Sequence, residues 1–235
     1  MVDFLQVRVE PTLFCYMKAL IVEDEKFVRE SLAELLINEY NFDEVVQADN
    51  GEMGWEVYQQ QPFQFIILDL MLPKLDGLKL AKRILECGRG QRILVLSSEC
   101  DDFTVREVSR CGILGFVCKT EMSLEVLDAA FRAVFEGHVY YSAKVDAVLD
   151  RLRDDPDAYF RVLSKRELQV LRFIAQRKTD AAVGLELDLS EFTVRRHRHN
   201  AMKKLNLKNE SSLLHFALDK GILKHKGGLD WSDGS

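Results

Sequence analysis

Five short apolar segments, each followed by a stretch of different character, constrain the fold of this chain more than any other feature. They span residues 19–22, 45–46, 65–68, 93–96 and 115–117. Each is nearly all apolar rather than alternating, which is typical of strands covered on both faces. The stretches between them place apolar residues on one side of a helix and charged residues on the other. Strand–helix alternation up to about Gly137 predicts a doubly wound α/β domain with a parallel five-stranded sheet.

The charge distribution divides the chain into two parts. Over 235 residues the formal net charge is −6, but residues 1–159 carry 17 basic and 29 acidic side chains, whereas residues 160–226 carry 15 and 7. An acidic first part and a basic second part favour two domains, the second able to bind nucleic acid. Two solvated surfaces of opposite sign fit the charges equally well. From Ser164 onward the pattern is all helical, and the proline-containing acidic stretch 154–157 marks a break before it.

These patterns predict the organisation of the whole chain. Met17 and Lys18 directly precede the first strand, so we interpret what comes before them as a flexible extension or a misassigned start codon. The expected parts are an N-terminal extension (1–16), an α/β domain (17–137), a helical or extended linker (138–159), a small all-α domain (160–226) and a tail (227–235).

The cysteine count and the lengths of the apolar runs predict the compartment. The five cysteines are odd in number and include no C-x-x-C pair, which favours reduced thiols in a cytoplasm over disulfides or a zinc site. No apolar run approaches the roughly 18 residues that a membrane span needs, and the N-terminus lacks the apolar core of a secretory signal. We therefore expect a cytoplasmic protein without a membrane partner.

Polar side chains follow four of the five predicted strands. Glu23 and Asp24 follow the first, Asp69 the third, Ser97 the fourth, and Lys119 comes shortly after the fifth. Function in a doubly wound sheet lies at the carboxyl ends of the strands. Neighbouring carboxylates repel each other unless a cation lies among them, and their oxygen atoms suit Mg²⁺. A carboxylate beside Mg²⁺ can attack a phosphoryl group, whose oxygens a lysine and a hydroxyl can hold.

Each of these residues alone has a simpler explanation. A lone aspartate after a strand is more often a turn or helix-cap residue, and a lone lysine or serine there is more often a surface side chain. Their joint placement after four strands disfavours those explanations and favours one phosphoryl-transfer site.

The motifs around these residues resemble a CheY-like receiver domain, which has a flavodoxin-like fold. The resemblance covers residues 18–137 and is carried by the sequences LIVED, ILDLMLP with a following DG, LSS and GFVCK, at 20–24, 67–77, 96–98 and 115–119. It implies that Asp69 accepts a phosphoryl group from a sensor histidine kinase. It also implies that Asp24, Asp69 and the backbone carbonyl of Met71 bind Mg²⁺, with Glu23 helping through water.

The same resemblance assigns three further residues. Ser97 and Lys119 would contact the phosphoryl group, and Phe116 would be the aromatic residue that switches conformation. The family often has two aspartates where this chain has Glu23 and Asp24, a change that keeps the charge but can shift metal affinity.

The second domain has motifs of its own. Ser164 fits a helix N-cap with Glu167 three residues later, the pattern of a capping box, and Thr179 and Ser190 fit the caps of two more helices. The stretches 187–197 and 203–207 resemble the LuxR-type helix-turn-helix, and the match runs over 163–223. The whole chain therefore resembles the NarL/FixJ-like regulators, which implies phosphorylation-controlled binding to double-stranded promoter DNA. Three departures, Arg177, Ala182 and Phe192, mean that no relative's sequence preference is carried over.

Helix geometry ranks the residues of the second motif helix, which we expect over 191–205. With about 3.6 residues per turn, Val194, Ala201 and Leu205 share a stripe that faces the core. The opposite side is basic, and a merely solvated charged face is the alternative to a DNA-binding one. The predicted DNA-binding residues are Thr179, Ser190, Phe192, Thr193, Arg195, Arg196, His197, His199, Lys203 and Lys204. In the segment 211–223, Leu214, Ala217, Leu218 and Ile222 lie near one helical face, and the simpler explanation for most of them is packing inside their own domain. By resemblance the last helix also pairs two DNA-binding domains, which predicts a homodimer when the protein is phosphorylated or DNA-bound.

Two other functions remain open from the sequence. A phosphohydrolase of the aspartyl-phosphate type would have a second acid two residues after Asp69, where this chain has Met71, and would leave the basic domain without a role. A receiver-like interaction module that is never phosphorylated is weakly favoured by Glu23. The set of Asp24, Asp69, Ser97 and Lys119 argues against it, so we expect a regulator rather than an enzyme.

Overall fold

The structure is a computed structural model that describes residues 16–88 and 90–223. The chain forms two compact units, which divide between Ile93 and Leu94. The predicted extension before Tyr16 and the predicted tail over 227–235 lie outside the described residues. No described helix is both long and apolar enough to cross a membrane.

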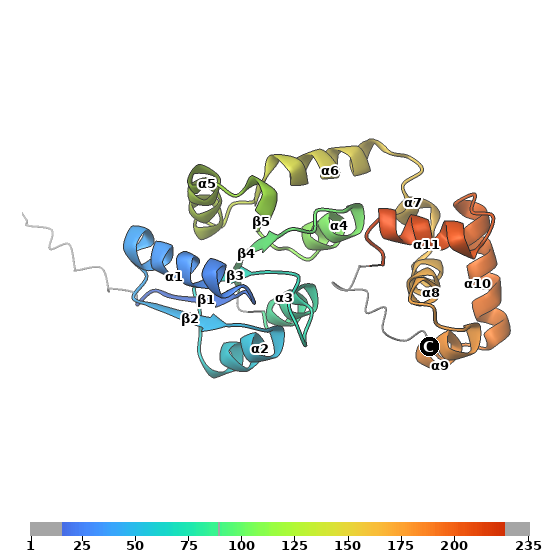
Figure 1. Ribbon diagram of the computed structural model, residues 1–235, viewed down its shortest axis with the longest axis horizontal. Coiled ribbons are helices and arrows are strands. Elements are labelled where there is room, and N and C mark those ends of the chain that lie inside the picture. The colour runs from blue at the N-terminus through green and yellow to red at the C-terminus, as the bar shows by residue number, and fades with distance from the viewer. Residues whose placement is uncertain (1–15, 89, 224–235) are drawn as a thin grey trace, which may run out of the picture. The chain divides into compact units, whose positions relative to one another are not determined.

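A six-stranded sheet with the order β2-β1-β3-β4-β5-β6 forms the frame of the α/β fold (Figure 1). In the first unit, β1 (Lys18–Val22) pairs in parallel with both β2 (Glu44–Ala48) and β3 (Phe65–Leu68). These strands match the predicted apolar runs. β2 is half-buried rather than fully covered, because it is an edge strand with a neighbour on one side only.

Three helices complete the first unit: α1 (Lys26–Tyr40), α2 (Gly51–Gln60) and α3 (Gly77–Glu86). α1 lies on one face of the strands, and α2 and α3 lie on the other (Figure 1). The Asp76 carboxylate caps α3 by accepting a hydrogen bond from the Lys79 N–H at 3.1 Å. A Cβ added at Gly77 would lie 2.0 Å from the backbone oxygen of Asp69, so only glycine allows this helix to begin so close to the end of β3.

The second unit carries the rest of the sheet, apart from the first two residues of β4. β4 (Arg92–Ser97) pairs in parallel with β5 (Gly115–Cys118), with Ser97 opposite Cys118. The helices of this part are α4 (Asp102–Arg110) and α5 (Leu124–Phe135), with a 3₁₀ turn, η1 (Lys119–Glu121), directly after β5.

A sixth strand, β6 (Tyr140–Tyr141), adds to the five predicted strands. It pairs in parallel with β5, and the Tyr140 N–H and Ser142 N–H donate to the carbonyls of Leu114 and Phe116 at 2.8 and 2.9 Å. Two half-exposed tyrosines give no apolar run, which is why the sequence pattern did not predict this strand.

The segment expected to be a helical or extended linker contains β6 and then α6 (Ala143–Asp154). The Glu121 carboxylate accepts hydrogen bonds from the Lys144 N–H at 3.0 and 3.1 Å, so the loop after β5 holds the first turn of this helix. The side chain that caps α6 is therefore that of Glu121, which is distant in sequence, and not that of the N-cap residue Ser142.

The remaining helices form the all-α part of the chain. They are α7 (Tyr159–Val162), α8 (Lys165–Ala175), α9 (Asp180–Leu187), α10 (Glu191–Lys204) and α11 (Glu210–Asp219). The capping box of Ser164 and Glu167 is confirmed, as are the N-caps at Thr179 and Ser190. Their core is apolar and includes Val170, Leu171, Ile174, Val183, Val194, Ala201, Leu213 and Ala217.

The turn between α9 and α10 is tight. Asp188 adopts the left-handed conformation (φ 54°) that ends α9, and a Cβ at Gly184 would lie 2.6 Å from the carbonyl oxygen of Leu189. The missing side chain at Gly184 therefore lets the turn fold back onto α9, as a helix-turn-helix requires.

Candidate functional site

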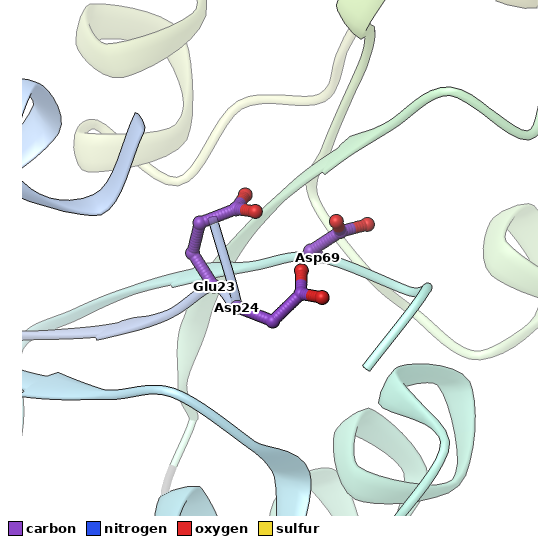
Figure 2. A group of neighbouring side chains, drawn as sticks. All are labelled: Glu23, Asp24 and Asp69. Carbon is purple, nitrogen blue, oxygen red and sulfur yellow. The ribbon is translucent and has the colours of Figure 1, made fainter. Parts of the chain in front are cut away.

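Three carboxylates gather where β1 and β3 end. One oxygen from each of Glu23, Asp24 and Asp69 lies within 4.8 Å of the others, and Figure 2 shows the three side chains together. Because β1 and β3 run in parallel, with Val22 opposite Leu68, the residues that follow them meet at one edge of the sheet. The sequence prediction that these acids form one cluster is borne out by this geometry.

Two of the three carboxylates in this cluster are buried, so water screens the repulsion between their charges poorly. Glu23 is 1% and Asp69 4% exposed, whereas Asp24 is exposed to solvent. Like charges at this spacing disfavour the ionised state unless hydrogen bonds or a cation offset the repulsion. The Met71 N–H donates to Asp69 Oδ1 at 3.0 Å, and the Glu25 N–H donates to Glu23 Oε1 at 3.2 Å.

The backbone around the cluster is fixed on both sides. The Asp69 N–H donates to the Val22 carbonyl at 2.9 Å, which continues the β1–β3 ladder to the aspartate. The Arg29 guanidinium donates to the carbonyl oxygens of Glu23 and Asp24 at 2.7 and 3.2 Å. An all-oxygen donor set that combines two buried carboxylates with an exposed one suits a hard cation such as Mg²⁺, which keeps part of its water shell.

The second unit places the other predicted receiver residues at the ends of β4 and β5. Ser97 is the last residue of β4 and is fully buried, and its hydroxyl oxygen accepts from the Glu99 N–H at 3.2 Å. Lys119 begins the turn after β5 and is half-exposed, directly after the register partner of Ser97. Phe116 lies within β5 and is fully buried.

The basic face of α10 is exposed as helix geometry predicted. Val194 and Ala201 are fully buried, and Leu205 packs against the same core. The opposite face is exposed and consists of Phe192, Arg195, Arg196, His199 and Lys203, while His197 is half-buried. Phe192 is 73% exposed, so its ring is accessible on the same face as the basic side chains.

Acidic side chains already hold two of the predicted DNA-binding cations. Arg195 Nη2 lies 2.7 Å from Glu191 Oε1, and Lys204 Nζ lies 2.7 Å from Glu167 Oε2. Within the described residues, Arg196 and Lys203 have no carboxylate at ion-pair distance. Arg196 and Lys203 are therefore the basic side chains of this face that can meet a nucleic acid without first leaving an acid.

One cation of this helix was missed by the sequence analysis. Arg198 Nη2 lies 3.0 Å from the Asp180 carboxylate, which also approaches Arg195 at 3.6 Å. Asp180 begins α9, so these pairs join the two helices of the motif. The four-residue spacing of Glu191 and Arg195 on one helix could have predicted their ion pair from the sequence. The ion pair of Arg198 and Asp180 joins two different helices, and no local pattern in the sequence predicts it.

The hydroxyl groups among the predicted DNA-binding residues cap the helices of the motif. Thr179 and Ser190 each accept a hydrogen bond from the backbone N–H three residues later, at 3.2 and 3.1 Å, and cap α9 and α10. The hydroxyls of Ser190 and Thr193 lie 2.8 Å apart. They fix the position at which α10 begins, which decides where its basic face points.

Glu167 links the two ends of this core. Its carboxylate accepts from the Ser164 N–H at 2.7 Å and from Lys204, which lies at the end of α10. Burial acts to raise the pKa of Glu167, but the hydrogen bonds from Lys204 and Ser164 outweigh it and hold this pKa below its ordinary value. One carboxylate thus fixes the start of α8 and the end of the basic helix.

Comparison with known families identifies both parts of the chain. Residues 19–132 match the response regulator receiver domain, and residues 161–217 match the bacterial regulatory proteins of the luxR family. The two matches contain the carboxylate cluster and the basic helix, respectively.

Curated relatives match over most of the chain. The transcription regulator BvgA of Bordetella pertussis is 31% identical over 86% of this chain and 97% of its own length. The oxygen regulatory protein NreC of Staphylococcus carnosus is 33% identical over 88% and 99%. Among solved structures, RcsB from Salmonella enterica serovar Typhimurium, bound to promoter DNA with the phosphomimetic BeF₃⁻, has a TM-score of 0.61 at 23% identity, covering 85% of this chain and 97% of that one. This structural likeness supports the fold.

Proposed function

This chain belongs to the NarL/FixJ class of two-component response regulators, with a receiver domain and a LuxR-type DNA-binding domain, and we propose that Asp69 is its phosphoryl acceptor. The observation that carries the proposal is the cluster of Glu23, Asp24 and Asp69, in which a buried aspartate lies beside two further acids. A sensor histidine kinase would be the donor. An oxygen of Asp69 forms the bond to phosphorus while the bond from phosphorus to the histidine nitrogen breaks.

The donor set fits one Mg²⁺ ion. Asp24, Asp69 and the backbone carbonyl of Met71 would hold it, and Glu23 would act through water. A bound ion supplies the positive charge that offsets the repulsion between a phosphoryl group and the carboxylates. Meanwhile the Met71 N–H orients Asp69, and the Arg29 guanidinium fixes the backbone of the two acids after β1.

We assign the phosphoryl contacts to Ser97 and Lys119, because a hydroxyl and an ammonium group can hold phosphoryl oxygens. Phe116, on the strand that leads to Lys119, is the proposed switch residue. The receiver is proposed to span 17–137 and the DNA-binding domain 160–226, and a cytoplasmic location suits both.

For the second domain we propose that α10 enters the major groove of promoter DNA. Arg195, Arg196 and His199 would reach base edges, where arginine prefers guanine, and Phe192 would lie against a thymine methyl group. Lys203 would meet phosphates, and so would Lys204 once Glu167 releases it. Thr179, Ser190, Thr193 and His197 lie around this helix as further contacts. Exposure of the basic face supports this assignment.

We also propose that the phosphorylated or DNA-bound protein is a homodimer. A dimer fits an operator made of two half-sites related by two-fold symmetry, and α11 is the proposed pairing helix. Leu214 and Leu218 on this helix are only partly buried, unlike Ala217, so they can contribute to such a contact.

The chemistry is tested by the variant Asp69→Asn, which keeps the size of the side chain and removes its nucleophilic charge. We expect acetyl phosphate with Mg²⁺ to add one phosphoryl group to the unmodified chain and none to the variant, measured by intact-mass spectrometry. Asp128→Asn, at a half-exposed aspartate on α5, is the matched control and should be phosphorylated like the unmodified chain. Equal phosphorylation of Asp69→Asn would show that the acceptor is another residue.

A further inference from the structure

Asp180 is an acid that the proposed function does not use, although it contacts the helix proposed to read DNA. It is the first residue of α9, and its side chain is only 8% exposed. An acid in the first turn of a helix stabilises that helix through the helix dipole, but this role needs no burial. Asp180 instead faces α10, where its Oδ2 atom lies 3.0 Å from Arg198 Nη2 and 3.6 Å from Arg195 Nε.

The two arginines that Asp180 contacts differ in exposure. Arg198 is half-buried where α9 and α10 pack against each other, whereas Arg195 is exposed on the basic face. One carboxylate thus connects the fixed part of the motif to a side chain of the face proposed to read bases. Its other oxygen, Oδ1, is buried and has no hydrogen-bond partner among the described residues. The carboxylate therefore has capacity to accept a further N–H from Arg195.

A second acid contacts the same guanidinium in a different way. Glu191 Oε1 accepts a hydrogen bond from Arg195 Nη2 at 2.7 Å, and Glu191 is exposed on α10 itself. Nη2 is one of the two terminal nitrogens of the guanidinium, which can donate together to one guanine, whereas Nε is the nitrogen nearest the stem. Glu191 therefore competes with DNA for Arg195, but Asp180 can keep its contact while both terminal nitrogens bind a base.

We propose that Asp180 is a positioning residue for base recognition, which holds Arg195 by Nε so that its terminal nitrogens meet one base in a fixed orientation. This inference rests on the DNA-binding function proposed for α10. A side chain that is already held loses less conformational freedom when it binds, and a fixed fork of donors discriminates better between base edges. Without the Asp180 charge, Arg195 would still attract DNA but would reach a phosphate as readily as a base. Asp180 thus sets selectivity rather than the strength of attraction.

The test is the variant Asp180→Asn, which keeps the size of the side chain and removes its charge. The full chain is titrated with a duplex that the unmodified protein selects from a random-sequence pool, with every single-base variant of that duplex, and with unrelated DNA. We expect the preference at one base position to fall about threefold to tenfold. The other positions should be unchanged, and Arg195→Ala should relax the same position.

Two control variants separate positioning from charge. Glu191→Gln removes the competing acid, so we expect tighter binding to all sequences with every base preference kept. Glu186→Gln removes one negative charge from α9, where Glu186 pairs with Lys178 just before that helix. This variant should also keep every base preference.

The double variant of Asp180→Asn with Arg195→Ala decides whether Asp180 acts through Arg195. We expect it to match Arg195→Ala alone at that base position, because the two side chains act as one unit. A further loss of preference in the double variant, or an equal loss at every position for Asp180→Asn, would assign Asp180 to packing of the motif and overturn the proposal.

The single variants distinguish failure of this proposal from failure of the proposed function. If Arg195→Ala loses a base preference that Asp180→Asn keeps in full, only the positioning role of Asp180 is wrong. If Arg195→Ala keeps every base preference, the DNA-reading role proposed for Arg195 is wrong, and the positioning role fails with it.

Discussion

At the scale of single residues, the exposed basic side chains of α10 differ in whether an ion pair must break before they can contact DNA. Arg196 has no acidic partner within the described residues, whereas Lys204 is paired with Glu167 at 2.7 Å. Arg196→Ala should therefore weaken specific binding by about 1–3 kcal/mol and relax the preference at one base position. Titrations against the preferred site and its single-base variants measure this. A uniform loss of affinity for every sequence would place Arg196 at a phosphate instead.

Lys203→Ala is the matched control for Arg196→Ala, because both side chains are exposed and unpaired within the described residues. We expect Lys203→Ala to weaken binding to all sequences alike and to reduce the dependence of affinity on salt, since a phosphate contact releases counterions. Lys204→Ala has a second effect, because it leaves the Glu167 carboxylate without its cation. Lys204→Ala is therefore a less direct test of a phosphate contact than Lys203→Ala.

Glu167 predicts how the stability of the DNA-binding domain depends on pH. Its pKa in the folded protein lies below its ordinary value of 4.5, so the stability it contributes is present above that value and is lost as the pH falls through the folded pKa. Glu167→Gln should lower the midpoint of thermal unfolding at pH 7, and the difference from the unmodified chain should shrink below about pH 4.5. A difference that stays constant down to acid pH would mean that packing, not charge, is what Glu167 supplies.

At the scale of elements, the start of α3 lies very close to the backbone of Asp69, the proposed phosphoryl acceptor. Gly77→Ala would put a Cβ 2.0 Å from the Asp69 carbonyl oxygen, so α3 must shift away, at a cost typical of overpacking, about 1–3 kcal/mol. We expect a lower unfolding free energy and slower phosphorylation by acetyl phosphate. Lys79→Ala, on the exposed side of the same helix, is the control. If Gly77→Ala matched it in both measurements, the close approach would have no bearing on the site.

The strands and caps show which elements the sequence could predict. Long apolar runs and capping residues are local signals, so β1, β3, β4 and β5 and the caps at Ser164, Thr179 and Ser190 were all predicted. β6 was not, because two half-exposed tyrosines held by backbone hydrogen bonds have no periodicity to detect. The carboxylate cluster followed from strand topology. The ion pairs of Arg198 and Lys204 did not, because their partners are distant in sequence.

At the scale of the whole molecule, Asp102 joins three helices of the second unit. This carboxylate is buried at the start of α4 and pairs with Arg151 on α6 and with Lys220 Nζ, at 3.0 Å, just after α11. The neighbouring Phe103 belongs to the apolar core of the all-α part, and its N–H donates to the Lys220 carbonyl at 3.0 Å. Asp102 therefore connects α4 with the linker helix and with the last helix.

Asp102→Asn removes the charge that both cations share. We expect the free energy of unfolding to fall by about 1.5–3 kcal/mol, the range for hydrogen bonds to charged groups. The loss stays below that of a fully buried pair because the Arg151 side chain is 62% exposed. Asp219→Asn is the matched control, since Asp219 also approaches Lys220, at 3.5 Å, but from an exposed position. Chemical denaturation of the full chain measures the free energy of unfolding of both variants. Equal losses would show that the burial of Asp102 does not strengthen its ion pairs.

Lys220 adds a dependence on alkaline pH to the same contact. Burial acts to lower its pKa, but the hydrogen bond and charge of Asp102 outweigh burial and raise it above the ordinary value of 10.5. The stability that Lys220 contributes is therefore complete below that value and disappears as the pH rises through the folded pKa.

Hydrogen bonds tie the segment after α5, which leads from the receiver domain to the DNA-binding domain, to the end of β5 and to the turn that follows it. Ser142 bonds to β5 through both its N–H and its hydroxyl, and Glu121 holds the first turn of α6. The end of β5 and the start of α6 are therefore joined by hydrogen bonds as well as by the covalent chain. A displacement at the end of β5 would be passed to α6 directly through these hydrogen bonds, and not only along the residues of α5 that lie between them in sequence.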